Sequence, residues 1–154
     1  MSRLHSYGLA IAILLATILD RWLKIMAVTR WSEPILFTRW FGWRPFFNSG
    51  VAFGLPLPHG LALVFSAIVI IVLLFLLITP KIINHPGLRL AIASIILGAT
   101  SNFFDRLRLG ITIDYLQILT GVFNLADGLI LAGFIYLVWS EYKKHRVEYL
   151  TNKS

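Results

Sequence analysis

Three stretches of the chain are apolar for long enough to cross a bilayer. Residues 61–79 form nineteen positions without a charge, and residues 122–140 form nineteen more in which Asp127 is the sole charged residue. Residues 90–104 add an uncharged fifteen, which reaches spanning length if the side chain of Arg89 extends to the interface. A transmembrane helix needs about twenty predominantly apolar residues. The pattern therefore predicts three membrane-spanning helices.

A fourth span is expected near the start of the chain. Residues 7–19 are an apolar thirteen, and a helical pattern continues through Asp20, Arg21 and Lys24 to about residue 28. The first span thus has a polar outer end. No small-x-small cleavage pattern follows the apolar run, so we expect this segment to be retained rather than removed as a signal peptide.

We therefore predict an all-α membrane protein with four transmembrane helices, built as one integral-membrane domain over residues 1–154. The expected spans cover about residues 7–28, 60–79, 88–104 and 122–141. The segment 81–89 is expected to be a plain connector. Small residues at four-residue spacing, Ser94 with Gly98 and Gly128 with Ala132, predict that the third and fourth spans approach closely.

The segment 31–58, between the first and second spans, mixes aromatic residues with arginines. This composition is typical of a membrane interface. Residues 35–40 and 44–51 resemble strands, and Gly42 between them permits a turn, so a small extracytoplasmic β-like element is expected on the outer leaflet. An aromatic belt without further purpose is an equally good interpretation of the composition.

Composition removes several function classes. Hydrophobic residues make up 58% of the chain, charged residues 14%, and the mean hydropathy is +0.79, which excludes an ordinary soluble domain. The net charge is +7, but the basic residues are scattered, so we expect anionic lipid headgroups as partners and no nucleic acid. The chain has no cysteine and no His-Glu-x-x-His pattern, and neither a metal nor another cofactor is expected.

Four spans place both termini on one side of the membrane. Basic residues are divided equally between the two faces, seven and seven. Four of the outer seven flank acids and are candidates for ion pairs, namely Arg21, Lys24, Arg106 and Arg108. The tail with Lys143, Lys144 and Arg146 then favours cytoplasmic termini.

The predicted topology gathers polar residues at the outer membrane face. Five of the seven acids fall there: Asp20, Glu33, Asp105, Asp114 and Asp127. Three amides accompany them: Asn48, Asn102 and Asn124. Taken singly, most of these residues have a structural explanation. Asp20 and Lys24 have the i, i+4 spacing of a surface ion pair, Asp105 and Arg106 could anchor a helix end while the acid also holds a loop backbone, and asparagines commonly cap helices.

Asp127 and Asp114 are harder to explain structurally. Asp127 is expected a turn inside the fourth span among apolar neighbours, and an ionisable group in a membrane is a functional candidate. If the two carboxylates meet, repulsion and desolvation leave them sharing one proton, which supplies one acid and one base for aspartyl hydrolysis. A proton or ion path through a small transporter fits the spacing equally well.

The polar clusters resemble those of the lipoprotein signal peptidases, the signal peptidase II family. They read Asp-Arg-Trp-Leu-Lys at 20–24, Asn-Ser-Gly-Val-Ala-Phe-Gly at 48–54, Ser-Asn-Phe-Phe-Asp-Arg at 101–106, Ile-Asp-Tyr at 113–115 and Phe-Asn-Leu-Ala-Asp at 123–127. The resemblance implies that Asp114 and Asp127 are the catalytic pair. It assigns supporting and substrate-binding roles to Asp20, Lys24, Asn48, Gly50, Asn102, Asp105, Arg106 and Asn124.

By the same resemblance, the chain is expected to be a membrane-embedded aspartyl endopeptidase of the bacterial cytoplasmic (inner) membrane. Its substrates would be diacylglyceryl-modified prolipoproteins, cut just before the lipid-modified cysteine after entry from the outer leaflet. A monomer without a cofactor is expected. A serine/lysine peptidase using Ser49 or Ser101 with Lys24 is a further alternative, although neither serine lies in a recognisable nucleophile pattern.

Three residues depart from the family pattern. Arg21 stands where glutamine is usual, Ser101 where glycine is usual, and Tyr115 where phenylalanine is common. The interval between Asp114 and Asp127 is also short, which predicts a trimmed outer loop over the site. No departure removes a carboxylate.

Overall fold

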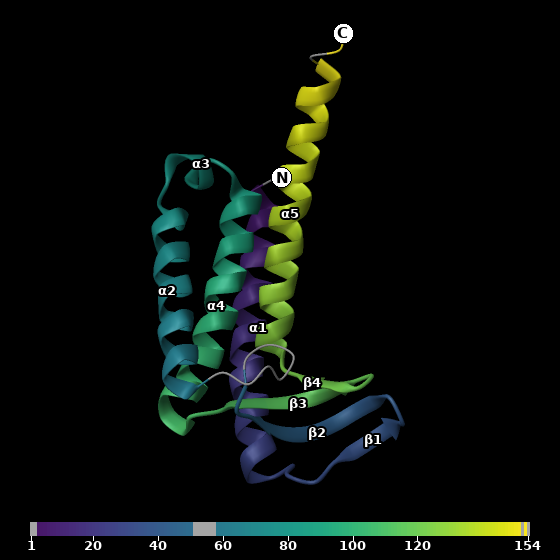
Figure 1. Ribbon diagram of the computed structural model, residues 1–154. Coiled ribbons are helices and arrows are strands. Elements are labelled where there is room, and N and C mark those ends of the chain that lie inside the picture. The colour runs from purple at the N-terminus through teal and green to yellow at the C-terminus, as the bar shows by residue number, and fades with distance from the viewer. Residues whose placement is uncertain (1–2, 51–57, 152, 154) are drawn as a thin grey trace.

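A computed structural model of the protein describes residues 3–50, 58–151 and 153. Its elements follow in the order α1 (Arg3–Thr29), β1 (Ile35–Thr38), β2 (Phe41–Asn48), α2 (His59–Leu77), α3 (Pro80–Ile83), α4 (Pro86–Leu109), β3 (Thr112–Ile118), β4 (Gly121–Phe123) and α5 (Leu125–Thr151). The long helices run alongside one another, and the strands form a layer across one end of the bundle (Figure 1). Both termini lie at the opposite end, where α5 projects beyond the other helices.

Three helices in the described part of the chain are long and apolar enough to cross a membrane: Gly60–Leu77, Pro86–Leu109 and Leu125–Thr151. They correspond to three of the four predicted spans. The third predicted span ended at residue 104, whereas α4 continues to Leu109. The connector predicted over 81–89 contains the short helix α3 and the first turn of α4.

α1 has the length of a span but is not among these three helices, so a fourth span remains a prediction. Its 27 residues extend for about 40 Å at the usual helical rise. Two charged side chains of its second half, Asp20 and Lys24, are 1% and 0% exposed. Leu15 and Ile18, by contrast, are 60% and 66% exposed. The helix therefore turns Asp20 and Lys24 toward the protein and Leu15 and Ile18 outward.

The sheet has four antiparallel strands in the order β1-β2-β3-β4. Half of it comes from the segment between α4 and α5, where the sequence analysis placed only a loop. The prediction of an all-α protein with a β-like element only between the first two helices is therefore incomplete. The missed signal is the run Thr-Ile-Asp-Tyr-Leu-Gln-Ile of β3, which is rich in β-branched and aromatic residues.

Gly42 was predicted as the turn between β1 and β2, and this is wrong. The turn falls at residues 39–40, and Gly42 lies inside β2, opposite Leu36. A Cβ atom on Gly42 would stand 2.6 Å from the carbonyl oxygen of Ile35. Glycine is required here because the backbone of β1 approaches too closely for a side chain. The predicted outer element at 31–58 is described as far as Gly50, and its residues 51–57 lie outside the described part.

α4 and α5 pack closely through small residues, but only partly through those predicted. The Ser94 hydroxyl donates to the carbonyl of Leu129 at 2.8 Å, and a Cβ on Gly98 would stand 2.5 Å from the carbonyl oxygen of Ala126. On α5 the close contact is made by Gly133. Gly128 and Ala132, which were predicted for this role, face away from α4: among the described residues, no atom beyond the adjoining turns of α5 lies within 4 Å of a Cβ on Gly128, and Ala132 is exposed.

This packing predicts different outcomes for two glycine substitutions. Gly98→Val should destabilise the protein by about 1–3 kcal/mol or more, because the added side chain meets a backbone oxygen that cannot move aside. Gly128→Val should change stability by less than about 0.5 kcal/mol, since the space around it is open. Thermal unfolding of both variants in one detergent checks the difference. Equal melting temperatures would contradict the close approach at Gly98.

Candidate active site

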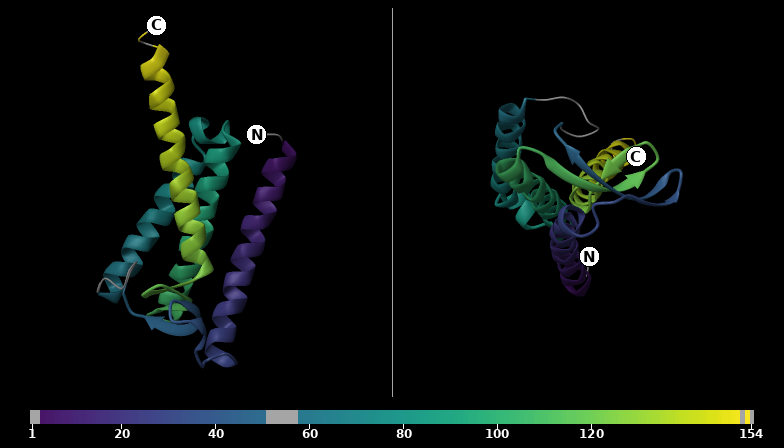
Figure 2. Two further views of the ribbon diagram at one scale, coloured as in Figure 1. Left: turned by 90° about the vertical axis from the view of Figure 1, so that its right-hand side faces the viewer. Right: turned by 90° about the horizontal axis from the view of Figure 1, so that it is seen from below.

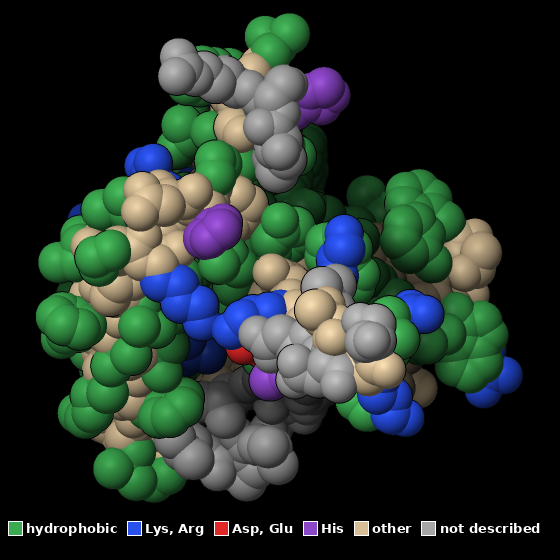
Figure 3. Space-filling view, turned by 90° about the horizontal axis from the view of Figure 1, so that it is seen from above, with side chains coloured by type: hydrophobic (Ala, Val, Ile, Leu, Met, Phe, Trp, Pro, Cys, Tyr) green, Lys and Arg blue, Asp and Glu red, His purple; other side chains and the backbone are tan. Residues whose placement is uncertain are grey.

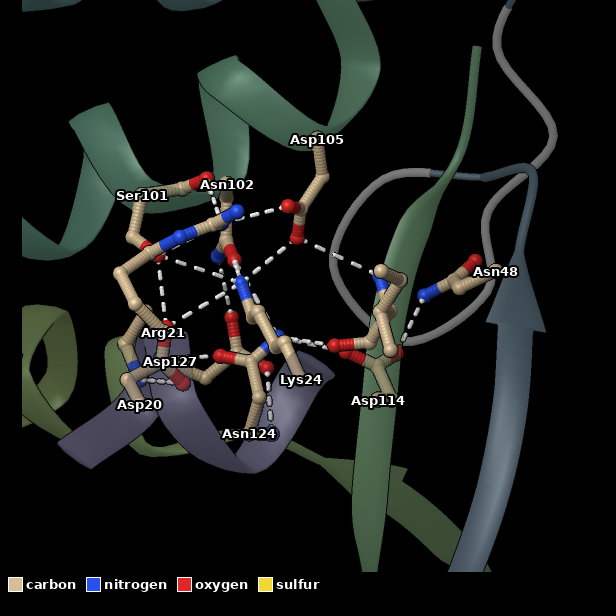
Figure 4. Close-up of polar contacts among 12 residues, drawn as sticks. Asp20, Arg21, Lys24, Asn48, Ser101, Asn102, Asp105, Asp114, Asn124 and Asp127 are labelled. Atoms are coloured by element: carbon tan, nitrogen blue, oxygen red, sulfur yellow. Dashed lines mark hydrogen bonds and ion pairs between the residues drawn. The ribbon is translucent and has the colours of Figure 1, made fainter. Parts of the chain in front are cut away.

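Four aspartates from four elements meet where the bundle joins the sheet. They are Asp20 of α1, Asp105 of α4, Asp114 of β3 and Asp127 of α5. Figure 4 shows their carboxylates among the amides of Asn48, Asn102 and Asn124 and the cations of Arg21 and Lys24. Three of the four are 1% exposed, and Asp127 is partly exposed. The predicted gathering of acids and amides is thus found for these residues, whereas Glu33, the fifth acid predicted there, is exposed and is not among them.

Asp127 lies in the first turn of α5, because the helix begins at Leu125. The sequence analysis placed it a turn inside the fourth span, and that position is wrong. The Asn124 side chain accepts the Asp127 backbone N–H at 2.9 Å, and the Asp127 carboxylate accepts the Asn124 backbone N–H at 3.2 Å. This reciprocal pair is a capping box at the helix start. The Asn102 amide donates to the other carboxylate oxygen at 2.8 Å.

Asp114 is held by two side-chain amides. Asn124 donates to Oδ1 at 2.6 Å, and Asn48 donates to Oδ2 at 3.0 Å. Asn124 therefore donates to both members of the predicted pair, to Asp114 through its side chain and to Asp127 through its backbone. One residue fixes both carboxylates in the same small volume.

The setting of Asp114 favours its protonated form. Burial, together with the negative charge of Asp127, raises the pKa of the Asp114 carboxyl to about 7, against the lowering effect of the hydrogen bonds from Asn48 and Asn124. A carboxyl group with this pKa is protonated in about half of the molecules near neutral pH. Asp114 is therefore suited to act as a general acid beside an ionised partner.

Lys24 organises the other two acids. Its Nζ lies 2.8 Å from Asp105 and 3.3 Å from Asp20, and it donates to the side-chain oxygen of Asn102 at 2.7 Å. The predicted Asp20–Lys24 pair exists, but it is buried inside the cluster and not on a helix surface. Because it is shielded from water, its ionic contacts count for more than those of an exposed pair.

Asp105 was predicted to pair with Arg106, but its ion pairs in the structure run to Arg21 at 2.5 Å and to Lys24. As predicted, it also holds backbone of the following segment, accepting the N–H of Ile113 in β3 at 3.4 Å. Arg106 is half-buried and interacts electrostatically with Asp127, Asp114 and Asp105.

The remaining predicted residues lie at the end of β2. Gly50 is buried, and its N–H donates to the side-chain oxygen of Asn48 at 2.9 Å. This bond turns the Asn48 amide nitrogen toward Asp114. Asn48 was considered as a helix cap, and in the structure it ends a strand instead.

Two residues in this cluster were not predicted to support the acids: Tyr115 was noticed only as a departure from a family pattern, and Ser101 as such a departure and as a possible nucleophile. The Ser101 hydroxyl donates to Asp20 Oδ2 at 2.6 Å, and the Tyr115 hydroxyl donates to Asp20 Oδ1 at 3.0 Å. Ser101 precedes Asp105 by four residues on α4, which places both on one helix face, and this spacing is the signal that could have identified it. Tyr115 had no such signal.

Comparison with known proteins decides the family. A family model described as signal peptidase (SPase) II matches residues 12–143, a span that includes every described member of the cluster. The chain belongs to the signal peptidase II family. Membership makes it a peptidase, and it gives no support to the transporter alternative.

Curated relatives of this signal peptidase II family member are lipoprotein signal peptidases. The protein of Halothermothrix orenii is 33% identical over 142 residues, covering 89% of this chain and 97% of its own length. That of Acinetobacter baylyi is 32% identical over 150 residues, covering 88% and 83%. A match to the protein of Moorella thermoacetica is 38% identical over 95 residues, which cover 60% of this chain and only 62% of that protein.

The fold of this family member is that of solved bacterial membrane enzymes. One such structure has a TM-score of 0.78 at 21% identity and covers 90% of this chain and 89% of its own. A second has a TM-score of 0.74 at 20% identity, with coverages of 86% and 91%. At this identity the likeness establishes the fold, and the roles of individual residues rest on the geometry.

The geometry also bears on the serine/lysine alternative. A lysine that activates serine must present a free lone pair. The Nζ of Lys24 instead contacts Asp105, Asp20 and Asn102, and Ser101 Oγ lies farther away at 3.4 Å. Ser101 already donates its hydroxyl hydrogen to Asp20. Lys24 and Ser101 are thus arranged as parts of an ionic cluster and not as base and nucleophile.

Proposed function

We propose that the protein is a membrane-embedded aspartyl endopeptidase that removes signal peptides from diacylglyceryl-modified prolipoproteins, cutting just before the lipid-modified cysteine. Family membership supplies the substrate class. The observation that supports an aspartyl mechanism is that Asn124 donates hydrogen bonds to both Asp114 and Asp127. The reaction needs no cofactor, because one protonated and one ionised carboxyl group supply both the acid and the base.

In the proposed reaction the ionised Asp127 removes a proton from a water molecule, whose oxygen attacks the scissile carbonyl carbon. Asp114 begins protonated and supports the carbonyl oxygen, which suits a buried group with a pKa of about 7. Collapse of the tetrahedral intermediate breaks the C–N bond, and the amide nitrogen leaves with a proton from the pair. No covalent intermediate with the enzyme forms. The partly exposed Asp127 is the member of the pair that water can reach.

We further propose that α1 is the fourth span and that the whole chain forms one membrane domain. Burial of Asp20 and Lys24 supports this, because the side chains left to face lipid include Leu15 and Ile18. With four spans both termini lie on one side. The view from that end shows many Lys and Arg side chains and hardly any Asp or Glu (Figure 3). Exposed Lys81 at that end agrees with a cytoplasmic position of the termini.

The sheet would then lie at the outer membrane surface. Its exposed aromatic side chains include Phe37, Trp40 and Phe47, which are 70%, 48% and 54% exposed. The guanidinium of Arg39 stacks over Trp40, with 4.9 Å between its Cζ and the ring centroid. Such a surface suits lipid headgroups and the extended substrate around the cut. Seen from below, the sheet extends to one side of the helices (Figure 2). We propose that the protein acts as a monomer and that the substrate binds next to this sheet.

The test is cleavage of a diacylglyceryl-modified prolipoprotein by the purified protein in proteoliposomes, beside the same precursor without the lipid. The proposal predicts a new N-terminus at the lipid-modified cysteine and little or no product from the unlipidated chain. Cleavage of the unlipidated precursor alone would make the substrate class wrong. If folded protein cuts neither, the proposed function fails, and an ion-flux assay in the same vesicles becomes the next measurement.

The raised pKa of Asp114 predicts the pH dependence of kcat/KM. Because the general acid must hold its proton, the activity should fall as the pH rises through about 7. The hydrogen bond from Asn48 favours the ionised form and lowers this pKa, so Asn48→Ala should move the alkaline limb to higher pH. Asn84→Ala, an exposed amide at the end of α3, is the control. An alkaline limb at the same pH in Asn48→Ala and wild type would contradict the assignment.

A further inference from the structure

Asp20 is not one of the two proposed catalytic acids, yet its partners come from all four elements that carry the aspartates of the site. Its Oδ1 accepts hydrogen bonds from the Tyr115 hydroxyl at 3.0 Å and from the Ala126 backbone N–H at 3.1 Å. Its Oδ2 accepts the Ser101 hydroxyl at 2.6 Å and lies 3.3 Å from Lys24 Nζ. These partners belong to β3, α5, α4 and α1.

Two of these partners are chain neighbours of the proposed catalytic acids. Tyr115 follows Asp114 on β3, and Ala126 precedes Asp127 on α5. The Tyr115 hydroxyl oxygen also accepts the backbone N–H of Leu125 at 3.0 Å. One hydroxyl group thus joins the strand that carries Asp114 to the first residue of the helix that carries Asp127. A shift of either contact changes the separation of the two carboxylates.

On this basis, and resting on the proposed function, we infer that Tyr115 and Ser101 are positioning residues that fix the spacing of Asp114 and Asp127 by clamping Asp20. Neither side chain reaches the carboxylates of the pair in the observed contacts. Tyr115 is 2% exposed and Ser101 is 3% exposed, so their bonds to Asp20 are shielded from water. Shielded hydrogen bonds to a carboxylate are among the stronger ones in proteins.

The surroundings hold Tyr115 ready to donate. Its ring stacks on Trp43, with centroids 5.1 Å apart and an angle of 24° between the planes. Burial, followed by the charge of Asp20, raises the pKa of the Tyr115 phenol, so the hydroxyl keeps its hydrogen across the working pH range. The ring stack does not depend on the hydroxyl, and Tyr115→Phe therefore removes the clamp while leaving the packing in place.

The chain offers a matched control for each residue. Tyr136 of α5 is a half-buried tyrosine beside Trp139, far along the helix from the site, so Tyr136→Phe removes a hydroxyl without touching Asp20. Ser94 of α4 is 4% exposed, and its hydroxyl donates to the Leu129 carbonyl of α5. Like Ser101, it joins two helices, so Ser94→Ala removes a buried helix–helix hydrogen bond that does not involve the acids.

The experiment measures kcat and KM for the lipidated precursor in wild type, Tyr115→Phe, Ser101→Ala and the two controls. Each test variant should lose about tenfold to a hundredfold in kcat with KM within about twofold, because misplacing a reacting group affects chemistry more than binding. The double variant should lose less than the product of the single losses, since both side chains act on one carboxylate. The controls should keep wild-type kcat.

Hydrogen–deuterium exchange provides a readout that does not depend on activity. Tyr115→Phe should speed exchange of the amides of residues 125–127 by about tenfold or more, with no change farther along α5. The reason is that the Tyr115 hydroxyl accepts the Leu125 N–H and holds Asp20, which in turn accepts the Ala126 N–H. Tyr136→Phe should leave these amides unchanged.

The outcomes separate the inference from the proposed function. A Tyr115→Phe variant with wild-type kcat and wild-type exchange overturns the inference while leaving the peptidase intact. A loss of kcat that only follows the unfolded fraction, as measured by the melting curve, also overturns it. If wild type does not cleave the lipidated precursor, the proposed function fails, and exchange at residues 125–127 alone then decides whether the clamp exists.

Discussion

Replacing either Asp114 or Asp127 with asparagine should reduce cleavage of the lipidated prolipoprotein by about four orders of magnitude or more, a size typical of removing one member of a catalytic unit. Asp127→Asn removes the base that takes the proton from water. Asp114→Asn removes the acid that supports the carbonyl oxygen. The double variant should lose little more than either single variant, because the two carboxylates act together.

Both variants should still fold, since asparagine keeps the size of the side chain and part of its hydrogen bonding. Melting curves in detergent check this. Glu33→Gln is the matched control, because Glu33 is an exposed acid between α1 and β1 and is not part of the cluster. It should retain activity within about twofold of wild type. If a folded Asp114→Asn or Asp127→Asn protein cleaves at more than about a hundredth of the wild-type rate, the catalytic pair is wrongly assigned.

Lys24→Met should have the largest effect on folding. Lys24 is 0% exposed and forms ion pairs with Asp20 and Asp105, each 1% exposed. Removing it leaves two buried carboxylates with one fewer cation, and breaking a buried ion pair in this way costs about 3–5 kcal/mol. We expect a large fall in melting temperature or loss of the folded protein from the membrane fraction, with activity lost as a consequence.

A second substitution separates the loss of charge balance from the loss of packing. Asp105→Asn removes one negative charge next to Arg21 and Lys24, so Lys24→Met combined with Asp105→Asn should be more stable than Lys24→Met alone. Lys81→Met removes an exposed lysine on α3 and should leave the melting temperature near that of wild type. A Lys24→Met protein with the same melting temperature as wild type would show that the cluster is not shielded from water.

The helices could be predicted because a run of about twenty apolar residues is typical of a membrane-spanning helix and of few other structures. The strand β3 could not, because its seven residues include Asp114 and lie between two spans, where a loop is the simpler expectation. Its formation depends on pairing with β2, from Phe41 opposite Ile118 to Asn48 opposite Thr112, and these partners are more than sixty residues apart in sequence. Pairing over this distance leaves no local pattern.

The short interval between Asp114 and Asp127 has a structural explanation that the sequence analysis lacked. It was interpreted as a trimmed loop over the site, whereas β3 and β4 fill most of it as a tight hairpin that turns at residues 119–120. Leu119 adopts a φ of 55°, which is uncommon for a residue other than glycine. The hairpin brings the chain back so that Asn124 can cap α5 and donate to Asp114.

The gathering of the acids and amides was predicted better than their individual contacts. Side-chain type and helix ends indicated which carboxylates and amides gather, and the family pattern selected Asp114 and Asp127 among them. The partners of Asp105 were predicted wrongly because Arg106 is adjacent in sequence, while Arg21 and Lys24 come from another helix. The pairing of cations with acids depends on how α1 and α4 are rotated against each other. The spacing of residues in the sequence does not predict that rotation.

Asp114 and Asp127 should titrate as one pair, and infrared difference spectroscopy of the carboxyl groups measures this directly. In wild type, one protonated carboxyl signal should disappear with a midpoint near pH 7, and it should be missing from Asp114→Asn. In Asp127→Asn the midpoint should move to lower pH, because the neighbouring negative charge that raises the pKa of Asp114 is gone. An unchanged midpoint in Asp127→Asn would mean that the two carboxylates do not interact, and the catalytic pair would have to be abandoned.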